Sequence, residues 1–145
     1  MEKQTRGERN NNPLNIKYNQ ANNWQGRRKP RRDVLFEEFI SVTYGIRAAM
    51  IIIRNYIKKH HINNLQSLIA RWAPQQENNV SLYLQYVAYK SRVKAGEPLR
   101  WTDKNKICRI VQAMAFYESN LDISFGIIEN AYAMANYNYT DFDVL

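Results

Sequence analysis

The apolar positions of this 145-residue chain predict a mainly helical protein. Between residues 41 and 136, apolar side chains recur at the three- and four-residue steps of amphipathic helices, and polar caps or prolines separate the stretches. The expected helices run to about Lys59 behind the cap Ser41, to Ala73 behind Asn64, from Val80 to about Val93 behind Asn79, from Asp103 to Glu118 behind Thr102, and from about Ser124 to Asn136. Gly45 lies inside the first of them. Because glycine costs a helix about 1 kcal/mol relative to alanine, we expect close packing at that position.

The first forty residues follow a different pattern, in which apolar and polar residues alternate over short stretches. Residues 34 to 39 (VLFEEF) read as a short strand that pairs with residues 15 to 18. The expected fold class is therefore α+β, mostly α, with about five helices and a small N-terminal β element. We expect a single domain over residues 1–145, made of a basic loop and β region (1–40), a helical region (41–136) and a tail (137–145) with no assigned element.

Three consecutive asparagines in RGERNNNPLNIKY (residues 6–18) indicate a built turn. Asparagine tolerates left-handed backbone conformations and hydrogen-bonds its own main chain, and the residue before Pro13 is pushed out of the helical region. We name residues 10–16 the asparagine loop and expect extended chain after it. A turn of this kind is often purely structural, so the loop alone indicates no function.

The net charge of +8 is concentrated near the N-terminus. Residues 1–32 hold nine Lys/Arg and two Asp/Glu, whereas residues 33–145 hold twelve and eleven. The densest part is RRKPRR, which we name the basic loop, and we expect Trp24 to be exposed beside it. Such a loop suits phosphates of nucleic acid or an anionic polymer of a bacterial wall, although a solvated surface loop has the same composition. The expected contacts are Arg27, Arg28, Arg31 and Arg32.

Several classes of site and location are not supported by the composition. The single Cys108 leaves no internal disulfide, and with two adjacent histidines no zinc-ligand set is complete, so we expect neither a metal nor a cofactor. The five glycines show no phosphate-binding spacing. The longest apolar run, residues 48–53, is too short to span a bilayer, and we expect no signal peptide.

Glu118 is the carboxylate with the most informative position. Ile107, Val111, Met114 and Glu118 recur at steps of four, three and four, so that the glutamate continues the apolar stripe of its helix. A carboxyl half-buried among apolar groups has a raised pKa, which suits a general acid near neutral pH. The alternative is a helix-end glutamate that bonds a backbone N–H group or an arginine.

Six strings that follow one another along almost the whole chain resemble a family of phage and prophage proteins. They are RGERNNNPLNIKY, NNWQG, FEEF, YGIRAAM, RWAPQQENN with the following Tyr83, and IVQAMAFYES. The family is usually labelled structural protein P5, and its members resemble lysozyme-like peptidoglycan hydrolases. The resemblance implies a lysozyme-like fold whose chain order is circularly permuted. Leu14 stands where the family usually has glycine, and Ser119 and Asn120 follow Glu118 in place of the usual Asn-Gly pair.

The resemblance also implies a reaction, the cleavage of peptidoglycan by a lytic transglycosylase or a muramidase with Glu118 as general acid and base. A transglycosylase needs one carboxyl, which protonates the leaving oxygen and then takes a proton from the sugar's own 6-hydroxyl group. A hydrolase needs a second carboxylate, for which Glu8 and Asp122 are the candidates. One well-placed glutamate fits the transglycosylase better.

Five further residues are candidates for binding the glycan if the resemblance holds. Asn12 and Asn15 are expected beside Glu118, where they would bond sugar hydroxyl and N-acetyl groups, and the aromatic residues would stack on sugar faces. Each has a structural alternative, as a turn former or as a core aromatic residue. The aromatic candidates are Tyr18, Trp24 and Trp72.

Two other functions remain open at this stage. A catalytically silent module that binds the cell wall or builds a virion is favoured by the departures at Leu14 and after Glu118. A nucleic-acid-binding protein would use the basic loop, but the predicted helices show no basic face. The expected location is the cytoplasm of a bacterial host or a phage virion, with action at the cell wall after release.

Overall fold

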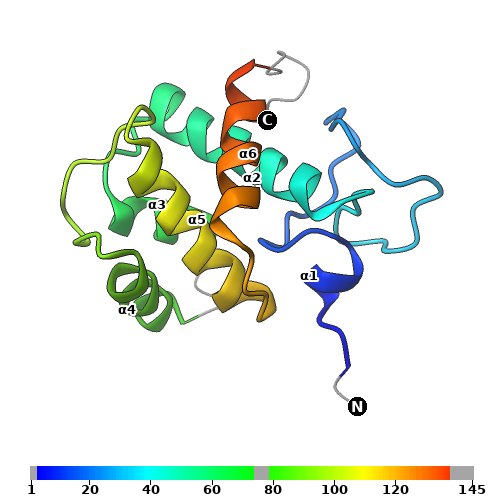
Figure 1. The fold of residues 1–145 in the computed structure, drawn as a ribbon, viewed down its shortest axis with the longest axis horizontal. Helices are drawn as coiled ribbons and strands as arrows, with labels where there is room; N and C mark the ends of the chain where they lie inside the picture. The colour runs from blue at the N-terminus through cyan, green and yellow to red at the C-terminus, as the bar shows by residue number, and fades with distance from the viewer. Residues whose placement is uncertain (1–2, 74–78, 138–145) are drawn as a thin grey trace.

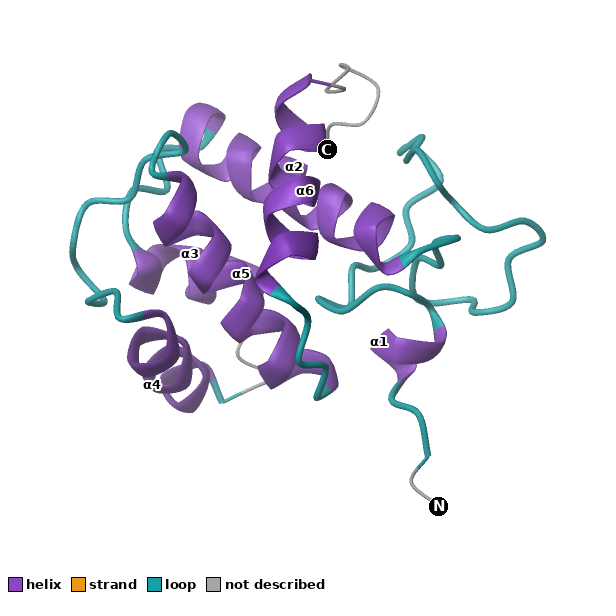
Figure 2. Ribbon diagram, in the orientation of Figure 1, coloured by secondary structure: helices purple, strands orange, loops and turns teal. Residues whose placement is uncertain are grey.

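A computed structural model describes residues 3–73 and 79–137 of the chain. Residues 74–78, which belong to the RWAPQQENN string, and residues 138–145 of the tail lie outside the described residues. Within them the protein is helical (Figures 1 and 2). The helices are α1 (Arg6–Arg9), α2 (Val42–Lys59), α3 (Leu65–Trp72), α4 (Val80–Ser91), α5 (Lys104–Ser119) and α6 (Phe125–Tyr137).

Polar caps start three of these helices as the sequence predicts. The side chains of Ser41, Asn64 and Asn79 accept hydrogen bonds from the backbone N–H groups of Tyr44, Ser67 and Leu82, at 3.4, 2.8 and 3.1 Å. The predicted helix ends are confirmed to within about two residues, because α3 ends before Ala73 and α4 before the left-handed Arg92.

The start of α5 and the presence of α1 differ from the expectation. Asp103, and not Thr102, is the N-cap of α5, and its side chain makes no capping hydrogen bond. The four-residue α1 was not predicted, since it is too short to show a periodic pattern. Its start is fixed by Thr5, whose hydroxyl group accepts a hydrogen bond from the backbone N–H group of Glu8 at 3.2 Å.

The expected β element is wrong: among the described residues the structure contains no sheet. Lys17 and Phe36 form one isolated antiparallel bridge, and Arg27 and Phe39 form a second one. Residues 10–41 therefore form an irregular lobe, drawn from blue to cyan on the right of Figure 1, and Figure 2 shows no strand in it. The fold class is all-α with an irregular N-terminal lobe, and not α+β.

Side-chain carboxylates explain why the expected strand does not form. The Asp33 carboxylate accepts hydrogen bonds from the N–H groups of Leu35 and Phe36, at 2.9 and 3.0 Å. The Glu38 carboxylate accepts those of Arg32 and Asp33. These donors are no longer available to a neighbouring strand, so a continuous ladder cannot extend. Burial within VLFEEF does not alternate either, because Val34 and Leu35 are exposed whereas residues 37–39 are all buried.

Helix packing places the end of α5 beside the irregular lobe. α2 packs against α6, α5 packs against both α4 and α6, and α1 packs against α5. The Thr5 hydroxyl group donates to the backbone oxygen of Ser119, the last residue of α5, at 2.7 Å. The predicted close packing at Gly45 is confirmed, because a Cβ atom there would collide with the carbonyl oxygen of Asn11 in the lobe. Among the described residues, no helix combines the length and apolar character needed to cross a bilayer.

Candidate active site

Glu118 lies in the last turn of α5, half-buried, and both of its carboxylate oxygens accept hydrogen bonds. The hydroxyl group of Tyr83 in α4 donates to Oε2 at 2.9 Å. The side-chain amide of Asn15 in the asparagine loop donates to Oε1 at 3.1 Å. The structure thus brings a residue of the N-terminal lobe against a glutamate 103 positions away in the sequence.

The asparagine loop holds its shape through Asn12, which is 0% exposed. Its side chain accepts the N–H group of Ile16 at 3.0 Å and donates to the backbone oxygens of Ile16 and Glu37, at 2.9 and 3.0 Å. Asn15 has φ 52°, in the left-handed region that asparagine tolerates better than most residues. The loop is the built turn that the sequence predicts. The Asn12 side chain makes its hydrogen bonds within the lobe and is not exposed to a ligand.

The loop is also fastened directly to the end of α5. The hydroxyl group of Ser119 donates to the backbone oxygen of Pro13 at 2.6 Å, and the buried Ser119 is the residue after Glu118. The indole N–H group of Trp72 donates to the backbone oxygen of Leu14 at 3.2 Å. These two contacts hold Asn15 in register with the Glu118 carboxylate.

Tyr83 is fully buried and supplies a permanent donor to Glu118. Burial first, and then the negative charge of Glu118, raise the pKa of the Tyr83 hydroxyl group well above its ordinary value. The phenol therefore stays protonated at any physiological pH. Its ring stacks on Tyr117 with the centroids 4.2 Å apart, which fixes the direction of the hydroxyl group. Sequence analysis missed this contact, because helix periodicity places Tyr83 among core residues and the motif that ends at Tyr83 does not say which residue it meets.

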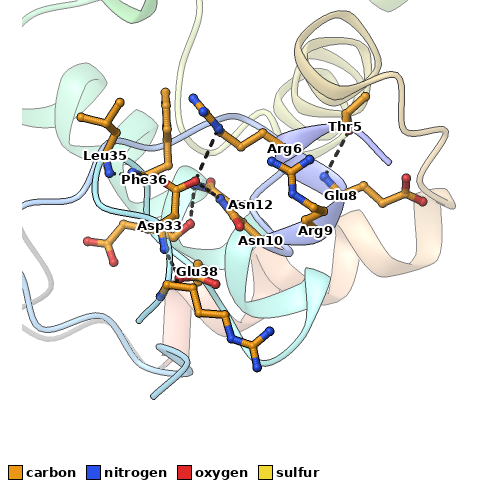
Figure 3. Close-up of polar contacts among 12 residues, drawn as sticks. Thr5, Arg6, Glu8, Arg9, Asn10, Asn12, Asp33, Leu35, Phe36 and Glu38 are labelled. Atoms are coloured by element: carbon orange, nitrogen blue, oxygen red, sulfur yellow. Dashed lines mark hydrogen bonds and ion pairs between the residues drawn. The ribbon is translucent and has the colours of Figure 1, made fainter. Parts of the chain in front are cut away.

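The two candidates for a second carboxylate lie on different elements. Glu8 is an exposed residue of α1, which packs against the end of α5. Figure 3 shows its side chain pointing away from Asp33 and Glu38. Asp122 is exposed after α5 and lines a hollow between α4 and α5. Among the described residues, no group of three or more His, Cys, Asp or Glu side chains is placed to hold a metal ion.

The three aromatic candidates have structural partners. Trp24 is 3% exposed, so the expectation that it is an exposed neighbour of the basic loop is wrong. The half-buried Trp72 holds Leu14, as described above. The ring of Tyr18 is covered by the guanidinium group of Arg31, which lies 3.5 Å from the ring centroid. Of the five proposed glycan contacts, Asn15 is the one that the structure brings against Glu118.

Ion pairs within the lobe use part of the basic loop. Arg27 forms a two-pronged contact with the fully buried carboxylate of Glu37, with hydrogen bonds of 2.9 and 2.7 Å. Arg28 pairs with the buried Glu38 at 3.1 Å. The sequence count of charges did not reveal these pairs, since both glutamates belong to the segment read as a strand. The basic loop is largely a structural element of the lobe.

The carboxylates of the lobe are stabilised in their charged form. Burial alone would raise the pKa of Glu38, but the backbone N–H groups of Asp33 and Arg32 and the guanidinium group of Arg28 outweigh it and lower that pKa. Asp33 has a lowered pKa for the same reason: the Asn10 amide and two backbone N–H groups outweigh its burial. Figure 3 shows Asp33 at the centre of this network, within reach of Arg6 and Asn10.

A hollow of about 260 Å³ adjoins this network. It is lined by more cationic than anionic side chains, and part of their charge is already paired. The lining residues are Arg9, Asn10, Arg28, Arg32, Asp33 and Glu38.

Comparison with known proteins gives a partial relationship. No protein-family model matches the chain. The chain is similar to Protein P5 of Pseudoalteromonas phage PM2, with 41% identity over 96 residues. The matched region covers 65% of this chain and spans 60% of the length of that relative. This similarity supports the part of the sequence-based resemblance that concerns phage P5 proteins.

Proposed function

We propose that this protein cleaves the glycan strands of peptidoglycan, with Glu118 as the general acid and base. The observation that carries the proposal is the placement of Glu118, whose carboxylate is held by Tyr83 from α4 and by Asn15 from the N-terminal lobe. A carboxyl held in one orientation is what positioned proton transfer requires. The sequence motifs that resemble lysozyme-like peptidoglycan hydrolases supply the substrate class.

In the proposed reaction, protonated Glu118 gives its proton to the glycosidic oxygen as the bond from that oxygen to the anomeric carbon breaks. The carboxylate that remains takes the proton of the sugar's own 6-hydroxyl group, whose oxygen then bonds the anomeric carbon. The products are a new hydroxyl end and a 1,6-anhydro sugar, and Glu118 is protonated again. The hydroxyl group of Tyr83 stabilises the carboxylate between the two transfers.

Asn15 can serve both protonation states of Glu118. Its Oδ1 atom is buried and makes no hydrogen bond with the described residues. A half-turn of the amide exchanges donor for acceptor opposite Oε1, so the side chain can accept from the protonated acid and donate to the carboxylate. We propose that Asn15 is a positioning residue that follows the proton on Glu118.

Removal of the proton donor is the first test. Glu118→Gln keeps the size of the side chain and removes its acid function, so cleavage of purified peptidoglycan should fall by about 10²- to 10⁴-fold. Glu129→Gln is the matched control, because this carboxylate lies in α6, where it pairs with Lys104 at 3.1 Å. Product analysis decides the reaction: anhydro-muramic ends support a transglycosylase, whereas reducing ends support a hydrolase and lead to the Glu8→Gln and Asp122→Asn variants.

The contacts to Glu118 give a second test. Tyr83→Phe keeps the ring stack on Tyr117 and removes one donor to the carboxylate, which disfavours its charged form. We expect slower cleavage and a pH–rate profile moved to higher pH. Asn15→Gly permits the same left-handed backbone and removes the amide. A profile that stays unchanged in both variants would show that these contacts only support the fold.

A catalytically silent wall-binding or virion module is the second candidate. It is favoured by the burial of Asn12 and Trp24, which leaves fewer groups for sugar than the motifs imply. Folded parent protein that releases nothing from several types of peptidoglycan would establish this candidate. As a proposal, the protein acts at the cell wall after release from a virion or from the cytoplasm of a bacterial host.

A further inference from the structure

A second hollow, of about 320 Å³, lies between α4 and α5 and is not part of the Glu118 contacts. Two residues come from α4, four from α5 and one from the segment after α5, so the walls belong to packed helices. The lining combines aromatic, cationic and acidic side chains. It consists of Tyr86, Lys90, Arg109, Gln112, Ala113, Phe116 and Asp122.

The charged groups of this hollow are not paired with one another. Elsewhere in the helical region lysines pair with acids, as in Lys106 with Glu97 at 2.8 Å. Lys90, Arg109 and Asp122 all line the hollow, and none of them forms an ion pair with a described residue. A cavity that presents two cations and one anion without internal pairing is complementary to a ligand that carries both signs of charge.

Two of the lining side chains are held in fixed orientations. The Nε–H group of Arg109 donates to the backbone oxygen of Ser91 at 2.8 Å, which directs the guanidinium group and leaves its terminal nitrogens to other partners. The amide nitrogen of Gln112 donates to the backbone oxygen of Ile123 at 2.8 Å. The second contact also fixes the backbone next to Asp122. The hollow is therefore preorganised by contacts that a ligand need not make.

A row of aromatic rings connects the hollow with Glu118. The ring of Tyr83, whose hydroxyl group bonds Glu118, stacks on Tyr117 with the centroids 4.2 Å apart. The next ring is Tyr86, whose centroid lies 5.5 Å from that of Tyr117 and 6.1 Å from that of Phe116. Tyr83 is buried, so the row serves only as a measure of distance. Its two steps from Tyr83 to Tyr86 add to at most about 10 Å, which roughly three residues of extended peptide span at about 3.3 Å each. A peptide attached to a sugar at Glu118 can reach the hollow.

We propose that the hollow binds the short peptide that peptidoglycan carries on its glycan strand. This inference rests on the proposed function, since it names a second part of the same substrate. Lys90 and Arg109 bind a carboxylate of the peptide, Asp122 binds an ammonium group, and the rings of Tyr86 and Phe116 cover its apolar atoms. The site recognises the peptide, whereas Asn15, Tyr83 and Glu118 act on the glycan.

The test compares binding of two soluble ligands to the Glu118→Gln protein, which does not consume them. One ligand is the N-acetylglucosamine and N-acetylmuramic acid disaccharide, and the other is the same disaccharide with a tetrapeptide. Calorimetry should show tighter binding of the ligand with the peptide. Adding Lys90→Gln and Arg109→Gln should weaken binding of the peptide-bearing ligand about tenfold, the effect of one charged hydrogen bond. Lys94→Gln with Arg100→Gln is the control, because it removes two exposed cations elsewhere.

A chemical variant of the ligand makes the test independent of protein folding. A tetrapeptide whose carboxylates are amidated should bind to the unchanged site about tenfold more weakly than the tetrapeptide with free carboxylates. Equal affinity for the plain, the peptide-bearing and the amidated ligand would overturn the inference. Failure of the proposed function gives a different result. If the parent protein cleaves no peptidoglycan but its Glu118→Gln variant still prefers the peptide-bearing ligand, the proposed reaction is wrong and the peptide site stands. If cleavage is normal but the variant shows no preference for the peptide, only the peptide site is wrong.

Discussion

The N-terminal lobe and the helical region satisfy their backbone groups in different ways. In α2 to α6 the backbone hydrogen bonds run mainly within each helix, and side-chain caps satisfy free N–H groups at the start of α2, α3 and α4. In the lobe, the buried Asn12 and Glu38 and the half-buried Asp33 hydrogen-bond backbone N–H and C=O groups outside any helix or sheet. The helices depend on a repeated local pattern, whereas the lobe depends on a few individual side chains. Single substitutions should therefore damage the lobe much more than the helices.

Loss of Arg27 should have the largest effect. Arg27→Gln leaves the fully buried Glu37 carboxylate without its ion-pair partner, and breaking a buried pair in this way costs about 3 to 5 kcal/mol. Urea unfolding measures the change in the free energy of unfolding. Arg32→Gln removes an exposed charge of the same loop and should cost less than about 0.5 kcal/mol. Equal losses in the two variants would mean that charge number, and not the buried pair, stabilises the lobe.

Truncation of Asn12 should come next. Asn12→Ala removes three buried hydrogen bonds and leaves backbone groups of Ile16 and Glu37 without partners, which predicts a loss of about 2 to 4 kcal/mol. The exposed Asn23 is the control for the same substitution. Unfolding by urea measures both variants. An unchanged midpoint for Asn12→Ala would contradict the idea that this side chain builds the loop.

Two glycine substitutions should change stability in opposite directions. In Gly45→Ala the new methyl group meets the backbone oxygen of Asn11, which belongs to the lobe and has little freedom to move, so we expect a loss of about 1 to 3 kcal/mol. In Gly126→Ala the new Cβ lies more than 4 Å from any described atom outside its own stretch of α6, and the helix should gain about 0.5 to 1 kcal/mol. Thermal unfolding checks the sign. A gain at both positions would show that the contact between α2 and the lobe is loose.

As the pH falls, the lobe should lose stability before the helices do. We expect this change to be smaller than those of the substitutions above. Asp33 and Glu38 have lowered pKa values, so the stability they contribute is present above their unfolded-state pKa and is lost as the pH falls through the lowered folded-state values. Hydrogen exchange should show Tyr18 and Glu37 amides losing protection below about pH 4 while amides of α5 keep theirs. Simultaneous loss in both regions would mean that the two parts unfold as one unit.

The residues of the candidate site also differ in whether local sequence or tertiary packing determines their positions. The position of Glu118 at the end of the buried stripe follows from the spacing in α5, so the sequence alone predicts where this glutamate lies. Asn15 was selected from a motif, and the structure brings it against Glu118. The position of Tyr83 opposite Glu118 depends on how α4 packs against α5, and no local pattern contains that information. The burial of Trp24 likewise depends on packing of the lobe, which is why composition misled the expectation for it.

The sequence by itself determined the long helices, the caps of α2, α3 and α4, and the stripe that ends in Glu118. These features follow from periodicity and from hydrogen bonds between residues three or four positions apart, which short stretches of chain specify. Only the tertiary structure decided that VLFEEF is not a strand, that Arg27 belongs to Glu37, and that Asn15 and Tyr83 meet on one carboxylate. Each of these depends on competition among partners distant in the chain, and the burial that decides such competition exists only after the helices and the lobe have packed together.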